Sequence, residues 1–271
     1  MITPHENPAG IPTALITGAS GGIGYEFAKL LAKDGYRIII VARSADRLEA
    51  IARDFADRFG IAAVPITEDL AIPGAPDSLY AKVRELGLTV DILINNAGIG
   101  SYGLFAETDL QTELQLMQLN MVSLTHLTKL FLRDMLPRGR GRILNMASTA
   151  AYQPGPLMAV YFASKAYVLW LSEALANELE GTGVTVTAFC PGPTNSGFKD
   201  RAGIHESGLF SGRTMKADVV AQIGYRAMMR GRTVAIAGLW NRILAFLTRL
   251  VPRKTITRGV KAAQTRLHGV R

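Results

Sequence analysis

Tyr161 and Lys165 are four residues apart in a stretch, residues 159–179, whose pattern predicts a helix. This spacing places the phenol and the ammonium group on one helix face, one turn apart. A phenol has an ordinary pKa of about 10, and a nearby cation favours the phenolate and lowers that pKa. Such a pair can give a proton to a carbonyl oxygen during a reduction, or remove one from an alcohol during an oxidation. A single Tyr-x-x-x-Lys pattern is, however, most often only a surface pair.

Ser148 follows a predicted strand at residues 141–147 and precedes Tyr161 by thirteen residues. In a doubly wound sheet, ligands bind at the carboxyl ends of the strands. A hydroxyl group at such an end can donate a hydrogen bond to a substrate carbonyl and stabilise negative charge on its oxygen. Ser148, Tyr161 and Lys165 together therefore predict a site for proton transfer at a carbonyl oxygen.

Residues 17–24 read Thr-Gly-Ala-Ser-Gly-Gly-Ile-Gly and connect a predicted strand (13–17) to a predicted helix (23–33). Glycines allow a tight turn and a close approach of the backbone to a pyrophosphate, and the helix N-terminus presents free N–H groups to that anion. Glycines are common in turns, but the strand–turn–helix context is the one that a dinucleotide site requires. The sequence therefore predicts a dinucleotide-binding turn.

The second predicted strand (37–42) is followed by Arg43 and has no carboxylate at its end. Sites that prefer NAD usually carry Asp or Glu there, which binds the ribose 2′-hydroxyl. A guanidinium instead suits a 2′-phosphate, so Arg43, helped by Arg47, favours NADPH. The alternative is that Arg43 is a solvated residue at the start of a helix.

Apolar strands alternate with helical patterns along the chain, which predicts a doubly wound parallel sheet with helices on both faces, in one domain. Most of the strands are continuous apolar runs, as expected when both faces are covered. The predicted strands are residues 13–17, 37–42, 62–66, 90–95, 141–147, 184–190 and 233–237, and the clearest predicted helices are 23–33, 45–59, 112–136 and 159–179.

The composition fits an enzyme-sized protein with a large core: 271 residues, 48% hydrophobic and 19% charged. The single cysteine, Cys190, excludes a disulfide framework and a cysteine-built zinc site, and it is expected to be a small packed residue. We expect no signal peptide and no transmembrane helix, because no basic start and no long apolar run is present. These features predict a cytoplasmic protein.

Positive charge is concentrated at the C-terminal end of the chain. Residues 1–218 contain 22 acidic and 19 basic side chains, whereas residues 219–271 contain 11 basic and no acidic ones. We therefore expect a dinucleotide-binding domain with an integrated catalytic site at residues 1–237 and a basic helical extension at residues 238–271.

An amphipathic helix is predicted at residues 239–251, where apolar side chains recur at helical spacing. Three interpretations compete. The helix packs on its own body or on a second subunit, it lies peripherally on an anionic membrane surface, or the tail binds nucleic acid. The last is the weakest, because no nucleic-acid recognition module is present.

The ordered motifs resemble those of the short-chain dehydrogenase/reductase family over residues 12–237, which implies a three-layered, doubly wound (Rossmann) fold. The resemblance is carried by the glycine turn, Asp69-Leu70, Asn95-Asn96-Ala97-Gly98, Asn120, Ser148, Tyr161 with Lys165, and Pro191-Gly192. It implies that Tyr161 is the general acid/base and that Lys165 lowers its pKa and binds the nicotinamide ribose.

The same resemblance implies roles for further residues. Ser148 would orient the substrate carbonyl, Asn120 would hold a water in a proton relay, Asp69 would contact the adenine, and Asn96 would stabilise the central strand beside the cofactor. The cofactor-binding set would be Gly18, Ser20, Gly22, Ile23, Gly24, Arg43, Asp69, Leu70, Asn96, Ala97, Gly98, Tyr161, Lys165, Pro191, Gly192, Thr194 and Ser196.

Two departures from the family pattern affect the cofactor. Many members that use NADPH carry Lys or Arg where this chain has Gly21, so use of NADH as well remains an alternative. The Thr that often reaches the nicotinamide carboxamide corresponds to either Thr194 or Ser196. An apolar loop at residues 195–215, with Phe198, Ile204, Leu209 and Phe210, is expected to cover the substrate, and residues 100–105 are expected to line the same cleft.

These features predict an oxidoreductase that transfers hydride between NADPH and a ketone or secondary alcohol. The basic extension resembles that of a subgroup of steroid and long-chain 3-oxoacyl reductases, which implies a hydrophobic substrate and a link to lipid metabolism. The resemblance also implies a homodimer or homotetramer. The alternative is a catalytically idle dinucleotide-binding sensor or scaffold, against which the complete Ser148, Tyr161 and Lys165 set argues.

Overall fold

A seven-stranded sheet lies at the centre of the molecule, in the order β3-β2-β1-β4-β5-β6-β9, and its neighbouring strands are parallel. The computed structural model describes residues 10–202 and 214–265. The strand order reverses between β1 and β4, and ligands bind at this point in doubly wound sheets. The strands are β1 (Thr13–Thr17), β2 (Arg37–Ala42), β3 (Ala63–Thr67), β4 (Val90–Asn95), β5 (Gly141–Met146), β6 (Val184–Cys190) and β9 (Val234–Ile236).

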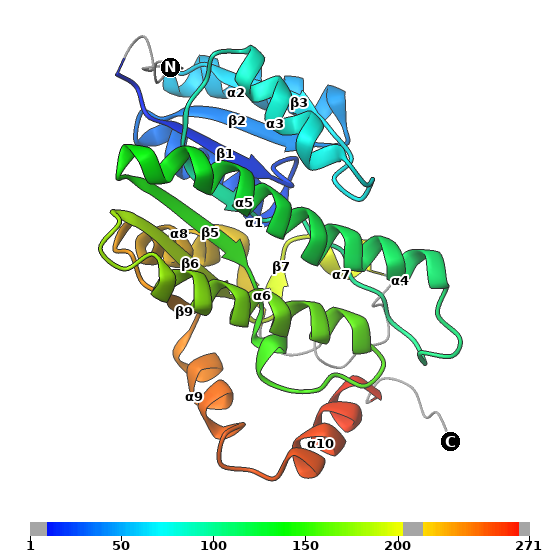
Figure 1. Cartoon of the computed structure of the whole chain (residues 1–271). Helices are drawn as coiled ribbons and strands as arrows, with labels where there is room; N and C mark the ends of the chain where they lie inside the picture. Colours follow the sequence, from blue (N-terminus) through cyan, green and yellow to red (C-terminus); the bar gives the residue numbers. More distant parts are fainter. Residues whose placement is uncertain (1–9, 203–213, 266–271) are drawn as a thin grey trace.

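Helices cover both faces of the sheet, which gives three layers (Figure 1). Phe27, Phe55 and Val220 share one core cluster, on the face covered by α1 (Gly22–Lys33), α2 (Ala45–Phe59) and α8 (Ala217–Met229). A second cluster contains Leu79 and Phe131, on the face covered by α3 (Ala75–Glu85), α5 (Leu124–Met135) and α6 (Ala159–Glu178). The predicted three-layered α/β fold is confirmed.

The strands are buried as their continuous apolar runs predict. All five residues of β1 are buried, and so are the four central residues of β2. The boundaries of three strands differ from the prediction by one residue at one or both ends, namely β3, β5 and β9. Helices α3 and α8 are not among the clearest helices that the sequence predicts.

The single helix predicted at residues 112–136 is wrong. The chain forms α4 (Leu110–Met117), a π-helical turn η1 (Gln118–Ser123), α5 and a 3₁₀ turn η2 (Leu136–Arg138). The π turn contains the fully buried Asn120, whose side chain bonds both backbone groups of Ile99. Such π turns within α-helices are frequent at functional sites.

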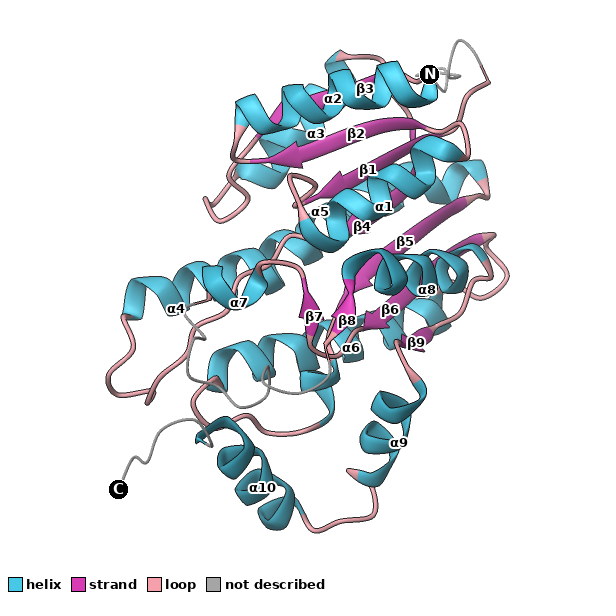
Figure 2. Ribbon diagram, turned by 180° about the vertical axis from the view of Figure 1, so that it is seen from behind, coloured by secondary structure: helices cyan, strands magenta, loops and turns pink. Residues whose placement is uncertain are grey.

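The C-terminal segment forms two helices instead of the one predicted, α9 (Leu239–Leu247) and α10 (Arg253–Thr265). Pro252 lies between them and disfavours helical conformation in the residue before it. Helix α10 returns to the body, where Val260 and Gln264 are buried and the Tyr102 hydroxyl donates to Gln264 O at 3.1 Å. Figure 2 shows α9 and α10 beyond the edge strand β9. None of the described helices is both long and apolar enough to span a bilayer.

Candidate active site

The glycine turn between β1 and α1 brings the backbone close to the end of β4. Gly18 has φ +66° and Gly22 has φ +56°, which are conformations that side chains rarely adopt. A Cβ atom at Gly18 would lie 2.9 Å from Ala97 Cα, and one at Gly24 would overlap Gly18 O and the Asn96 side chain. The turn therefore tolerates no side chain at these positions, and α1 begins with its N–H groups at the sheet edge.

Asn96 holds this turn against β4. Its Nδ2 donates to Thr17 O at 2.9 Å and to Gly18 O at 3.2 Å. The Thr17 Oγ1 in turn accepts from the backbone N–H groups of Asn96 and Ala97, both at 3.0 Å. Gly24 packs behind the turn, so its role is to allow this close approach, and it does not line the cavity.

Arg43 lies at the end of β2, facing Asp69, which follows β3. Arg43 NH1 is 3.9 Å from Asp69 Oδ2, and the two side chains are 67% and 35% exposed. Asp69 Oδ1 also accepts from Ala71 N at 3.0 Å. The nearest atom to a Cβ built at Gly21 is the Arg47 guanidinium, at 4.0 Å, so a second cation lies beside the glycine turn. Both arginines line the cavity described below.

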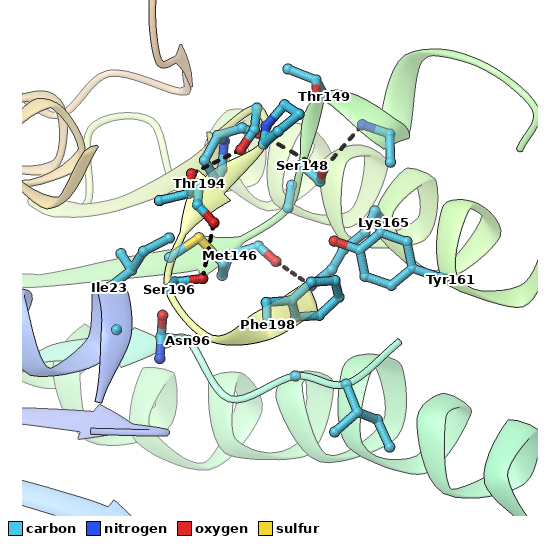
Figure 3. A pocket seen from close by; sticks show the side chains of 18 of the residues that line it. Ile23, Asn96, Met146, Ser148, Thr149, Tyr161, Lys165, Thr194, Ser196 and Phe198 are labelled. Atoms are coloured by element: carbon cyan, nitrogen blue, oxygen red, sulfur yellow. Dashed lines mark hydrogen bonds between the residues drawn. The ribbon is translucent and has the colours of Figure 1, made fainter. Parts of the chain in front are cut away.

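Tyr161 and Lys165 lie in the first turns of α6, as their spacing predicts. Lys165 Nζ is 5.7 Å from the centre of the Tyr161 ring and donates to Met146 O at 2.8 Å. Lys165 is 4% exposed. Figure 3 shows both side chains at the cavity beside Met146 and Phe198.

Burial shifts both groups toward their neutral forms. Burial raises the pKa of Tyr161 to about 12, and a hydrogen bond with the Ser148 hydroxyl acts in the opposite direction. Burial lowers the pKa of Lys165 to about 8. The expected lowering of the Tyr161 pKa by Lys165 is therefore not found in this structure, because the loss of solvation dominates.

Ser148 lies two residues after the end of β5 and caps the short 3₁₀ helix η3 (Thr149–Tyr152). Its Oγ accepts from Ala150 N at 3.1 Å and is 3.4 Å from Pro191 O. Ser148 and Tyr161 both line the cavity at the carboxyl ends of the strands, and the Ser148 hydroxyl is close enough to the Tyr161 phenol to lower its pKa. A carbonyl oxygen at that point could accept from both.

Asn120 lies behind this point and is not among the residues that line the cavity. Its Oδ1 accepts from Ile99 N, and its Nδ2 donates to Ile99 O and to Ser164 Oγ. A Cβ atom built at Gly98 would be 3.1 Å from Asn120 Oδ1 and 3.5 Å from Lys165 Nζ. Asn120 thus fixes the segment after β4 against α6, and its expected role in holding a water stays a prediction.

Thr194 and Ser196 both reach the cavity, from β7 (Thr194–Asn195) and the turn that follows it. Thr194 Oγ1 donates to Gly192 O at 2.9 Å, and the Ser196 backbone packs on Gly22. β7 pairs with β8 (Met215–Lys216), which together with the short helix α7 (Phe198–Arg201) was not predicted. The hydroxyl groups of Thr194 and Ser196 both remain candidates for binding the carboxamide of the nicotinamide.

The expected apolar cover is described only in part. The Phe198 ring lies 5.3 Å from the Tyr161 ring, centre to centre, which fits that expectation. Ile204, Leu209 and Phe210 lie outside the described residues. The expectation for residues 100–105 is wrong, since none of them lines the cavity. Phe105 is 69% exposed, and the Tyr102 hydroxyl is turned to α10.

One cavity of about 1060 Å³ joins the glycine turn to Tyr161. All the predicted site residues line it except Gly24 and Asn120. Sequence reasoning missed its C-terminal wall, although the apolar periodicity at residues 239–251 was visible. The wall residues are Trp240, Asn241, Leu244, Ala245, Leu247, Thr248 and Val251 from α9 and the segment after it, and Ile256, Gly259, Val260 and Ala263 from α10.

Comparison with known proteins gives consistent matches. A family model described as short chain dehydrogenase matches residues 12–206. A very-long-chain 3-oxoacyl-CoA reductase of Phaeosphaeria nodorum is 41% identical over 178 residues, which are 64% of this chain and 52% of that protein. The chain thus spans about half the length of this curated relative.

Two solved structures match almost the whole chain. A short-chain dehydrogenase from Sphingobium yanoikuyae, in complex with NADPH, is 32% identical with a TM-score of 0.81, over 93% of this chain and 95% of that one. A bulky-bulky ketone specific alcohol dehydrogenase from Comamonas testosteroni is 27% identical with a TM-score of 0.75, over 96% and 97% of the two chains.

Proposed function

This chain belongs to the short-chain dehydrogenase family, and from that premise we propose that it reduces a hydrophobic ketone, of the 3-oxoacyl thioester class, with NADPH. The observation that carries the proposal is the convergence of Ser148, Tyr161 and Lys165 on the same cavity as the glycine turn. The apolar C-terminal wall of that cavity and the 3-oxoacyl-CoA reductase named among the relatives support the substrate class.

The residues present fit a dinucleotide cofactor. The side-chain-free turn at Gly18 and Gly22 leaves room for a pyrophosphate at the start of α1. Arg43 and Arg47 supply positive charge where a 2′-phosphate would lie, which favours NADPH with NADH as an alternative. When bound, the cofactor supplies a hydride to the carbonyl carbon.

Tyr161 would supply the proton in this reaction. A raised pKa keeps its hydroxyl protonated at neutral pH, which is the form that a reduction needs. Ser148 would donate to the same carbonyl oxygen and stabilise the charge that develops on it. Lys165 uses one of its three N–H groups on Met146 O, and the others are available to a ribose. The products would be a secondary alcohol and NADP+, and the Tyr161 phenolate would regain its proton from water.

The test is NADPH oxidation, followed as loss of absorbance, with a panel of ketones and 3-oxoacyl thioesters. We expect turnover by the natural sequence and none by Tyr161→Phe, which should still bind NADPH because the glycine turn is untouched. Turnover by Tyr161→Phe at the natural rate would remove Tyr161 from its role. A folded protein that binds NADPH but reduces no member of the panel would support the alternative, an idle sensor or scaffold.

Assembly and location belong to the same proposal. We propose that the protein is a cytoplasmic homodimer or homotetramer with one domain. Residues 238–271 would be an extension of this domain, and the extension would contact a membrane surface peripherally. Leu239 at the start of α9 and Leu250 shortly before the basic helix α10 are 73% and 66% exposed, which supports that contact. Co-sedimentation with anionic vesicles should be weaker for a Leu239→Glu, Leu250→Glu variant, and equal sedimentation would contradict the membrane contact.

A further inference from the structure

Helix α9 separates two cavities and presents a different kind of side chain to each. A second cavity of about 890 Å³ lies on the other side of α9 from the first. Trp240, Leu244, Leu247 and Val251 line the first cavity only, whereas Arg242, Phe246, Arg249 and Arg253 line the second only. On α9 itself, Trp240, Leu244 and Leu247 form an apolar stripe toward the first cavity. Arg242 and Phe246 of α9 face the second cavity, and its other two arginines come from the residues after α9: Arg249 from the connecting segment and Arg253 from the start of α10.

The two cavities adjoin close to the catalytic tyrosine. Five residues line both: Gln153, Phe162, Ala245, Thr248 and Ile256. Phe162 directly follows Tyr161 in α6, Ala245 is a buried residue of α9, and Thr248 directly follows that helix. The boundary that the two cavities share therefore lies beside Tyr161, where the substrate carbonyl would be held.

The second cavity is suited to an anion. Its described lining holds three arginines and one carboxylate, Glu173. None of the three arginines forms an ion pair with a described carboxylate; Arg242 Nε donates to Ile236 O at 3.2 Å. Arg253 is the first residue of α10, so the partial positive charge of that helix N-terminus adds to theirs. Guanidinium groups bind phosphate oxygens through charge-assisted hydrogen bonds.

A 3-oxoacyl thioester has two unlike ends. An apolar chain extends from one side of its reactive carbonyl, and a thioester that carries a phosphate-bearing pantetheine arm extends from the other. We propose that the second cavity binds the phosphates of this arm through Arg242, Arg249 and Arg253, while the acyl chain stays along the apolar stripe of α9. This inference rests on the proposed function and specifies its substrate: an acyl group on an anionic carrier, not a neutral ketone.

The test compares 3-oxododecanoyl-CoA with the N-acetylcysteamine thioester of the same acyl group, which carries no phosphate. Changing Arg242, Arg249 and Arg253 together to Gln should raise KM for the CoA thioester by about tenfold or more, the usual effect of losing hydrogen bonds to a charged group. KM for the N-acetylcysteamine thioester and kcat for both should stay unchanged. The matched control changes Lys254, Arg258 and Lys261 to Gln, which removes the same charge from residues outside the cavity lining.

Calorimetric titration of the full chain with free CoA gives a second measurement that needs no turnover. We expect binding to the natural sequence and to the control variant, and none to the arginine variant. Equal effects on the two thioesters, or equal effects of the two triple variants, would overturn the proposal. Loss of anionic vesicle binding with unchanged CoA kinetics would overturn it also, since the arginines would then serve a lipid surface.

The same measurements separate this inference from the proposed function. If neither thioester is reduced but free CoA binds and the arginine variant abolishes that binding, the phosphate site stands and the reductase proposal fails. Suppose instead that the N-acetylcysteamine thioester is reduced, that free CoA does not bind, and that KM for the CoA thioester is no lower than KM for the N-acetylcysteamine thioester. The reductase proposal then stands and the phosphate site fails.

Discussion

At Lys165 an ammonium group is 4% exposed, and burial lowers its pKa to about 8. The group is charged in the unfolded chain up to its ordinary pKa, so the unfolded state binds more protons between about pH 8 and 10.5. The free energy of unfolding should therefore rise with pH across this window. Below it the folded protein bears the full cost of burying the charge, about 3 kcal/mol by the usual conversion of a pKa shift.

Lys165→Met should remove this cost and the activity together. We expect the variant without cofactor to be more stable than the natural sequence at pH 7, by up to about 3 kcal/mol, because it buries no charge. The gain should shrink as the pH rises above 8. Urea unfolding at pH 7 and at pH 10 measures both values, with NADPH oxidation as the activity control. An advantage that is the same at both pH values would contradict the assigned titration.

Arg43 should select the cofactor through the 2′-phosphate. Arg43→Ala removes a guanidinium that is 67% exposed and engaged only at 3.9 Å with Asp69, so little stability should be lost. KM for NADPH should rise by about tenfold, the usual effect of losing a charge-assisted hydrogen bond, and KM for NADH should change little.

The matched control for Arg43 is Arg53→Ala, which removes an exposed arginine from α2 that faces Glu49 at 4.0 Å and does not line the cavity. It should leave both KM values unchanged. If Arg43→Ala leaves the ratio of KM for NADPH to KM for NADH unchanged, Arg43 does not select the 2′-phosphate.

At the scale of elements, the glycines at the junction of β1 and α1 differ in whether a side chain would fit in their place. A Cβ at Gly24 would overlap Gly18 O and the Asn96 side chain, whereas the nearest atom to a Cβ at Gly21 is 4.0 Å away. Gly21 also has φ 173°, an extended conformation open to any residue. Two glycines three residues apart in one turn therefore have different roles.

Gly24→Ala should destabilise the junction by about 1–3 kcal/mol, as overpacking does, and weaken NADPH binding because the turn must move. Gly21→Ala should leave the thermal midpoint without cofactor unchanged. Thermal unfolding of both variants with and without NADPH measures the difference. If the two variants unfold at the same temperature, the tight contact of Gly24 has no energetic consequence.

The elements predicted best from the sequence are those that local pattern determines. The strand–turn–helix at Gly18 and the one-turn spacing of Tyr161 and Lys165 depend on residues close together in the chain, and both are found as predicted. The π turn around Asn120 could not be predicted, because it depends on bonds to Ile99, across 21 positions. The return of α10 depends on Tyr102 and Gln264, 162 positions apart. The spacing of apolar residues along the sequence gives no information about such long-range contacts.

At the scale of the whole molecule, the C-terminal charge has a different meaning from the one that composition alone suggests. The segment with 11 basic and no acidic side chains forms one wall of the cavity that contains Tyr161, and it does so with uncharged side chains. Its arginines Arg242, Arg249 and Arg253 line the second cavity instead, where we propose that they bind phosphates of the substrate. The body, by contrast, has exposed apolar residues on α4–α6, and the proposed assembly of subunits is tested there.

Trp170 and Tyr167, three residues apart on α6, are 73% and 39% exposed, and the Tyr167 hydroxyl is 2.9 Å from Thr125 Oγ1 of α5. Trp170 also lies at the second cavity. Exposed apolar side chains that lie together on neighbouring elements mark an interface between subunits. Figure 1 shows α5 and α6 side by side on one face of the sheet. A homodimer through these helices would bury Trp170, so Trp170→Glu should dissociate it, because an unpaired charge in such an interface is strongly unfavourable.

Sedimentation velocity should then give a dimer or tetramer for the natural sequence and a smaller species for Trp170→Glu. Phe105→Glu is the control, since Phe105 is 69% exposed but lies in a turn outside helices α4, α5 and α6, and it should leave the assembly unchanged. An assembly that survives Trp170→Glu would remove α6 from the interface. Because Tyr161 and Lys165 lie on the same helix as Trp170, loss of the dimer should also lower the thermal midpoint and, with it, the temperature at which activity is lost.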